Sequence, residues 1–155
     1  GLGDVYKRQH VDASKGMVTW AKENAVSSGL GDAPIRWLVD DCVKFVEREI
    51  RRGNTYDAII MDPPSYGRGP KGEIWKIEDM IHPLIKLCTK ILSKDALFFL
   101  VNSYTTGLAP AVLTYMISTE LKPWNGHVDS QEIGLPVTDS GLVLPCGASG
   151  RWERD

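Results

Sequence analysis

Long apolar runs are missing from this chain, which has no stretch near the ~20 consecutive apolar residues that a membrane-spanning helix needs. Its first residues also lack the pattern of a signal peptide. Cysteine is scarce as well: three residues at wide spacing fit neither a disulfide framework nor a CxxC metal site. We therefore expect a cytoplasmic protein with reduced thiols, no membrane anchor and no bound metal.

An excess of one charge is also absent. The net charge is -2 with 25% charged residues, so no global basic field indicates a nucleic-acid partner, although a local patch remains compatible with one. With 43% hydrophobic residues and no low-complexity tract, residues 10–155 are expected to form one globular domain. The sequence does not indicate an oligomeric state.

Residues 1–9 read GLGDVYKRQ and show neither helical nor strand periodicity. The string DVYKRQ resembles read-through of a sequencing adaptor, and we expect these nine residues to be a non-native tail outside the fold.

Apolar strands and amphipathic helices alternate along most of the chain. Strands are predicted at 10–12, 35–39, 56–61 and 96–101, with helices following near Ser14, Asp41, Ile77 and Pro110. Gly29 and Gly53 stand where the first two helices would end. Segments 127–133 and 141–144, with turn residues between them, predict an antiparallel hairpin. The pattern predicts an α/β fold with a mostly parallel sheet and an antiparallel edge.

The most specific string is Asp62-Pro63-Pro64-Ser65-Tyr66, which follows the apolar strand 56–61. Two adjacent prolines fix two φ angles and remove two backbone donors, so they form a rigid turn whose carbonyls can accept hydrogen bonds from a planar amine. Tyr66 can stack on a heteroaromatic ring. Residues 62–72 are predicted to form a substrate-facing lid. The alternative is a stiff turn that only ends the strand.

Acidic residues follow three predicted strands, at Asp12, at Asp40-Asp41 and at Asp62. The carboxyl ends of parallel strands meet at one edge of a sheet, so we expect these side chains to line one crevice. Asp12 is placed to accept hydrogen bonds from ribose hydroxyls. Asp41, with Asp40 second, is placed to accept from an adenine amine while the Cys42 amide donates to a ring nitrogen. Each acid alone could instead be a helix N-cap.

Four segments resemble the class I S-adenosylmethionine-dependent methyltransferases, in the group related to bacterial 23S ribosomal RNA base methyltransferases. They are VDASK at 11–15, VDD at 39–41, MDPPSYGRG at 61–69 and NSYTTGL at 102–108. The resemblance implies a Rossmann-like sheet over roughly 11–152 and S-adenosyl-L-methionine as cofactor. It assigns cofactor binding to the residues around the first two acids, which are Asp12, Ala13, Asp40, Asp41 and Cys42.

By the same resemblance, the Asp-Pro-Pro loop positions a nitrogen of an RNA base, with ribosomal RNA as the expected partner. The catalytic set is Asp62, Pro63, Pro64 and Tyr66, and the substrate-binding set is Ser65, Arg68 and Lys71. Lys76 and Arg151 are further candidates for RNA contacts, the alternative being ordinary solvated charge. Trp75 could stack on an extruded base, although packing is the commoner role.

Two departures from the family pattern stand out. Relatives that methylate carbon 5 of cytosine carry a cysteine after the next strand, where this chain reads Asn102-Ser103-Tyr104, so that reaction is not expected. Cys88 and Cys146 are expected to be structural. The first strand and glycine-rich loop are also absent, which predicts weak or no cofactor binding by the chain as it stands.

Two other function classes remain open. A non-catalytic RNA- or protein-binding module could keep this fold after losing activity. A nicotinamide-dependent oxidoreductase would share the acid after the second strand, although the Asp-Pro-Pro string argues against it.

Overall fold

A computed structural model describes residues 8–69 and 71–155. The chain divides into two compact units, 1–52 and 53–155, and each is described by itself. Most of the predicted tail, residues 1–7, lies outside the described residues, whereas Arg8 and Gln9 already belong to the first strand. Within the described ranges, no helix combines the length and the apolar character that crossing a bilayer requires.

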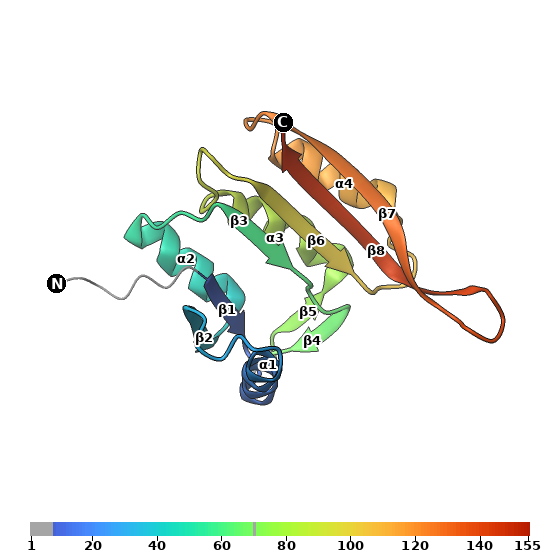
Figure 1. Ribbon diagram of the computed structural model, residues 1–155. Coiled ribbons are helices and arrows are strands. Elements are labelled where there is room, and N and C mark those ends of the chain that lie inside the picture. The colour runs from blue at the N-terminus through green and yellow to red at the C-terminus, as the bar shows by residue number, and fades with distance from the viewer. Residues whose placement is uncertain (1–7, 70) are drawn as a thin grey trace. The chain divides into compact units, whose positions relative to one another are not determined.

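The first unit is two strand-helix repeats. They comprise β1 (Arg8–Asp12), α1 (Lys15–Ser27), β2 (Ile35–Val39) and α2 (Cys42–Arg52). Strands β1 and β2 pair in parallel with Asp12 opposite Val39, so both strands end at the same edge (Figure 1).

The predicted helix boundaries in this unit are confirmed by local contacts. The amide of Met17 donates to the Ser14 hydroxyl at 3.3 Å, which makes Ser14 the N-cap of α1. The chain leaves α1 through Gly29 at φ 76° and α2 through Gly53 at φ 70°, a region that glycine adopts at little cost.

The second unit is built on a four-stranded sheet in the order β3-β6-β8-β7. Its strands are β3 (Ala58–Met61), β6 (Phe98–Ser103), β7 (Gly126–Pro136) and β8 (Val143–Arg154). Strand β3 is parallel to β6, and β8 is antiparallel to both β6 and β7. Figure 1 shows α3 (Ile77–Thr89) and α4 (Pro110–Glu120) on one face of this sheet. The mixed α/β fold with parallel strands and a closing antiparallel hairpin confirms the predicted class.

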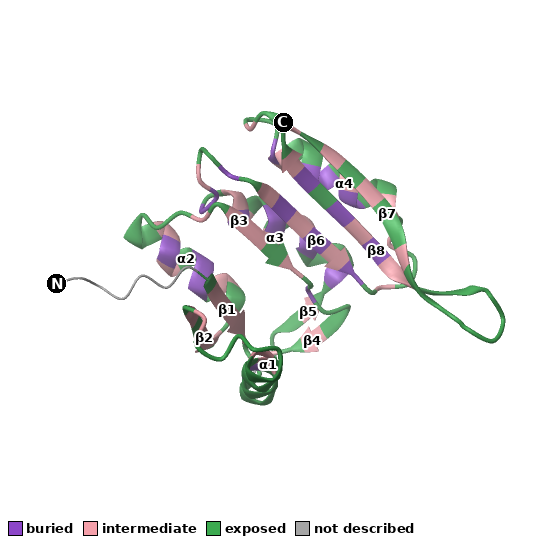
Figure 2. Cartoon of the chain, viewed as in Figure 1, coloured by how far each residue is buried: buried purple, intermediate pink, exposed green. Residues whose placement is uncertain are grey.

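Alternation along the strands separates the helix-covered face from the open face (Figure 2). Phe99 and Val101 of β6 and Trp152 of β8 face the helices and are at most 2% exposed. On the other face, Leu100 is half-buried and Ile60 of β3 is 64% exposed. Strand β3 is therefore an outer strand of this sheet and only partly buried.

Several segments differ from their predicted extents. Strand β6 continues through Asn102 and Ser103, because the pairing with β8 runs on to Ser103 opposite Ala148. The terminal hairpin is longer than predicted and projects beyond the rest of the sheet, with a bulge between Ile133 and Gly134 (Figure 1). Its pairing depends on partners that a local apolar pattern does not reveal.

Candidate functional site

In the first unit the acids after β1 and β2 lie side by side. The Asp40 amide donates to the Asp12 carbonyl at 2.9 Å, which closes the parallel pairing at the ends of the two strands. One carboxylate oxygen of Asp12, Oδ1, accepts from the Ser14 amide at 2.7 Å and closes the turn into α1. Adjacent strand ends therefore carry the carboxylates, as predicted from the sequence.

Asp41 acts as the N-cap of α2, since the Lys44 amide donates to its Oδ1 at 2.9 Å. Asp40 forms an ion pair with Arg48, and its Oδ1 accepts from the Asp41 amide at 2.9 Å. Both Asp40 oxygens are thus occupied. Among the described residues, the second oxygen of Asp12 and that of Asp41 have no hydrogen-bond partner.

Ala13 and Cys42 complete the predicted cofactor group. Ala13 is exposed between β1 and α1, and Cys42 is the first residue of α2. The Cys42 thiol donates to the Val11 carbonyl at 3.5 Å and so ties α2 to β1. One open oxygen on each of Asp12 and Asp41, at neighbouring strand ends, fits the ribose hydroxyls and exocyclic amine of an adenosine group.

In the second unit, Asp62 is the first residue after β3 and its side chain is exposed. In residues 8–69 and 71–155 it has no hydrogen bond or ion pair to another side chain. Pro63 next to it is buried, so the turn is anchored while the carboxylate faces outward. An unpaired carboxylate on a rigid proline turn can accept hydrogen bonds, and a proton, from a bound amine.

The expectation of an irregular loop over 62–72 is wrong in part, because this segment enters a small hairpin. Strand β4 (Tyr66–Arg68) pairs antiparallel with β5 (Ile74–Lys76), and the Gly69 amide donates to the Glu73 carbonyl at 2.8 Å. Backbone pairing to a segment just beyond the proposed loop fixes its shape, which a count of proline and glycine could not reveal.

One face of this hairpin carries Tyr66, Arg68 and Lys76. Tyr66 lies directly opposite Lys76, and Arg68 is two residues from Tyr66 on the same strand, so the three share a side. The Arg68 Nε donates to the Tyr66 hydroxyl at 3.0 Å, and Tyr66 is 51% exposed. An exposed aromatic ring beside two cations can stack on a base and attract phosphate.

Trp75 lies on the opposite side of the hairpin. Its indole Nε1 donates to the Pro64 carbonyl at 2.6 Å. The contact favours the packing role over base stacking. The Pro64 carbonyl, one of those predicted to receive a substrate amine, therefore already has one donor.

Ser65 also has a distant partner, since its hydroxyl lies 2.6 Å from that of Thr105. Sequence reasoning missed this contact of Thr105, although the residue belongs to the NSYTTGL segment that carried the resemblance. Nothing in a local pattern signals a bond between residues forty positions apart.

The two remaining cation candidates differ. Lys71 is exposed, and its backbone amide donates to Glu73 Oε2 at 2.9 Å. Arg151 lies on the open sheet face beside Leu100 and Asp129 and forms an ion pair with Glu153 at 2.5 Å. Leu100 pairs with Ile60 of β3, so Arg151 lies two strands away from the strand that carries the Asp62 turn. Its paired charge fits the ordinary surface role.

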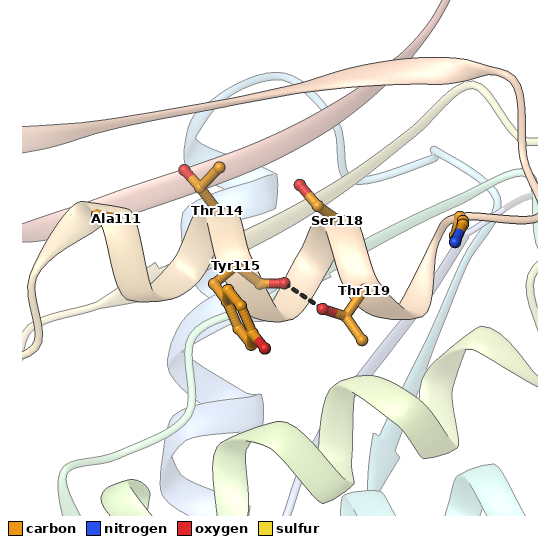
Figure 3. Close-up of a pocket in the computed structure, with 6 residues that line it drawn as sticks. Ala111, Thr114, Tyr115, Ser118 and Thr119 are labelled. Carbon is orange, nitrogen blue, oxygen red and sulfur yellow. Dashed lines mark hydrogen bonds between the residues drawn. The ribbon is translucent and has the colours of Figure 1, made fainter.

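A hollow along the outer side of α4 contains none of the predicted site residues (Figure 3). Thr119 bonds the Tyr115 carbonyl at 2.7 Å and Thr114 bonds the Pro110 carbonyl at 3.5 Å, so these hydroxyls serve their own helix. Cys88 is buried in α3, and the Cys146 thiol donates to the Leu144 carbonyl at 3.3 Å. No cluster of three metal-ligating side chains occurs in the described part of the chain.

Known proteins resemble the chain in sequence and in fold. No protein-family model matches the chain. A curated relative, ribosomal RNA large subunit methyltransferase K of Neisseria meningitidis, is 26% identical over 102 residues, which are 65% of this chain and 29% of that protein. Ribosomal RNA large subunit methyltransferase K/L of Pseudoalteromonas atlantica is 32% identical over 92 residues, 59% of this chain and 13% of that protein.

Among solved structures, a SAM-dependent methyltransferase from Agrobacterium tumefaciens has a TM-score of 0.85 and 38% identity, covering 95% of this chain and 49% of that one. A methyltransferase solved with S-adenosylhomocysteine shares the fold at a TM-score of 0.74 and 20% identity, covering 93% of this chain and 38% of that one.

The chain thus spans about half of the Agrobacterium structure and less than a third of the curated relatives. Neither alternative, the oxidoreductase or the non-catalytic module, is favoured by these relatives. By sequence and by fold, the chain is a relative of the class I S-adenosylmethionine-dependent methyltransferases and, within them, of the large-subunit ribosomal RNA methyltransferases.

Proposed function

We propose that the protein carrying this chain transfers a methyl group from S-adenosylmethionine to a nitrogen of a ribosomal RNA base, in the cytoplasm. The observation that carries the proposal is the Asp62 carboxylate, exposed and unpaired among the described residues at the end of β3. The curated relatives named as ribosomal RNA methyltransferases support the acceptor class.

In this proposal the first unit holds the cofactor. Asp12, with Ala13 beside it, accepts from the ribose hydroxyls through the oxygen that Ser14 leaves open. Asp41 accepts from the adenine amine, and the Cys42 amide at the start of α2 donates to a ring nitrogen. Asp40 acts through its ion pair with Arg48, which stabilises the turn into α2, and does not contact the cofactor directly. When bound, S-adenosylmethionine supplies an electrophilic methyl group on sulfur.

The second unit holds the acceptor. Asp62 and the Pro63 carbonyl accept hydrogen bonds from the acceptor nitrogen, and Asp62 takes the proton that this nitrogen releases. Tyr66 stacks on the base, and Arg68 and Lys71 contact the phosphate backbone. Ser65 supports the turn through its contact with Thr105. Because methyl transfer is a direct displacement, alignment and charge stabilisation supply most of the rate.

The test is transfer of label from methyl-labelled S-adenosylmethionine by the full-length gene product. Ribosomal RNA, total cell protein and a small-molecule extract are offered separately, with RNA from a strain lacking the gene as the unmethylated acceptor. We expect label on the RNA, and on a base nitrogen after digestion to nucleosides. Label on protein or metabolites alone, or RNA binding without transfer, would contradict the proposal.

A further inference from the structure

We propose that Trp75 is a positioning residue for the Asp62-Pro63-Pro64 turn and that Thr105 is a second one. The inference rests on the proposed function, since it assigns these residues to the geometry of the acceptor site. Neither side chain touches the acceptor in this scheme; each acts through the turn.

Two supporting contacts, here called braces, hold the turn: Trp75 on Pro64 and Thr105 on Ser65. The first brace joins β5 to the turn. The Trp75 indole donates to the Pro64 carbonyl at 2.6 Å, a short distance for a nitrogen donor. Pro64 has no amide hydrogen, so this carbonyl is its only backbone hydrogen-bonding group. Trp75 stands opposite Gly67 in the hairpin, where a Cβ added to Gly67 would lie 3.9 Å from both the Pro64 ring and the Trp75 Cβ. The Cβ of Trp75 and the ring of Pro64 therefore both lie close to Gly67.

The second brace joins the turn to the segment after β6. The hydroxyls of Ser65 and Thr105 lie 2.6 Å apart, and the Thr105 amide donates to the Ser103 hydroxyl at 3.3 Å. Ser103 is 1% exposed and paired opposite Ala148 in the sheet, so Thr105 starts from a fixed strand end. The Ser65 carbonyl also accepts from the Ile77 amide at 3.1 Å.

Beside these contacts, two acceptors on the turn have no donor in the described part of the chain. The Pro64 carbonyl already has a donor, whereas neither the Asp62 carboxylate nor the Pro63 carbonyl accepts a hydrogen bond from the described residues. A turn held from two sides keeps these oxygens in one geometry before the acceptor binds. Pre-set acceptors lower the barrier because they need no reorganisation during the reaction.

The kinetic test uses the full-length gene product with Trp75→Phe, which keeps an aromatic ring but removes the N–H donor. We expect kcat to fall by about 10-fold, as the loss of one well-placed hydrogen bond would give, with KM for RNA and the Kd for S-adenosylmethionine changed by less than about twofold. If Trp75 stacked on the base instead, Trp75→Phe would keep kcat and Trp75→Ala would raise KM, and the proposal would be wrong.

A matched control is available in the same unit. Trp124 also uses its indole nitrogen, donating to the Ser93 carbonyl at 2.8 Å. Ser93 bonds to Tyr56 and Asp57 just before β3, whereas the Asp62 turn follows the other end of that strand. Trp124→Phe is expected to lower thermal stability without changing kcat. An equal loss of kcat in both variants would show a general effect of destabilisation and would count against positioning by Trp75.

The second brace is tested by rescue. Thr105→Val removes the hydroxyl at nearly constant volume and is expected to lower kcat, while Thr105→Ser restores the hydroxyl and the rate. The exposed neighbour Thr106 provides the control variant Thr106→Val. Unchanged kcat in Thr105→Val, or failure of Thr105→Ser to restore it, would overturn this part.

A readout independent of activity separates this inference from the proposed function. The indole N–H signal of Trp75, identified by its loss in the Trp75→Phe spectrum, is expected to exchange with solvent more slowly than that of Trp20, which is 57% exposed. Equal exchange rates would overturn the brace whatever the enzyme does. A wild-type protein with a protected Trp75 and no methyl transfer would instead contradict only the proposed function.

Discussion

The amide of Asp40 donates to the carbonyl of Asp12 at 2.9 Å, which joins the two strand ends beside which Asp12 and Asp41 are proposed to hold the cofactor. This backbone bond belongs to the parallel pairing that places Asp12 opposite Val39. The relative positions of the two acids therefore do not depend on their side chains, and each carboxylate can be changed without moving the other.

Asp12→Asn is expected to weaken S-adenosylmethionine binding by about 10-fold and RNA binding by much less. The amide oxygen of asparagine can still accept from the Ser14 amide, so the turn into α1 is kept while the charge facing the ribose is lost. Separate calorimetric titrations of the two ligands measure the difference. Asp32→Asn, at an exposed turn of the same unit, is the control; equal losses for both ligands would argue against a cofactor role.

Two substitutions of Asp41 are expected to separate its role as an N-cap from its role in cofactor binding. Asp41→Ala removes the acceptor of the Lys44 amide and is expected to lower the free energy of unfolding by about 1 kcal/mol. Asp41→Asn keeps a good N-cap and should cost almost nothing in stability, yet weaken cofactor binding. Urea unfolding and cofactor titration of both variants test this. Full cofactor affinity in Asp41→Asn would leave the residue as a cap alone.

Asp62→Ala is expected to reduce methyl transfer by about 100-fold or more, the size of loss typical for a positioned acid or base. Its carboxylate bonds to no other side chain in the described ranges, so the melting temperature should hardly change. Single-turnover assays and thermal melts provide the measurements.

The control for Asp62 is Asp57, whose carboxylate accepts from the Ser93 hydroxyl at 2.7 Å at the opposite end of β3. Asp57→Asn should affect stability slightly and turnover not at all. Near-parental turnover in Asp62→Ala would reduce Asp62 to a strand-terminating residue.

Gly147→Ala is expected to destabilise the second unit by about 1–3 kcal/mol. Gly147 has φ 148°, and a Cβ there would lie within contact distance of the Ser103 carbonyl, far inside the normal limit. Gly141→Ala, at φ 68° with open space around it, should cost about 1 kcal/mol. Both variants strain the backbone, but only Gly147→Ala adds a steric clash. Thermal unfolding measures the two losses of stability, and equal losses would exclude the clash as the main cause.

The features that could be predicted from the sequence depend mainly on residues that are close together along the chain. Ser14, Gly29 and Gly53 set helix ends because a cap or a positive φ involves only a few neighbouring residues. The apolar runs before Asp12 and Asp62 predicted parallel strands ending in carboxylates for the same reason.

Only the tertiary structure shows which of the polar groups at these strand ends already have hydrogen-bond partners. Trp75 on the Pro64 carbonyl, Thr105 on Ser65, and Arg48 on Asp40 are contacts that no spacing rule predicts. The pairings that make part of the expected loop a hairpin and extend β6 through Ser103 are of the same kind. Such bonds depend on partners that folding brings together, whereas the sequence by itself determined most of the elements, the ends of α1 and α2, and the chemistry at the strand ends.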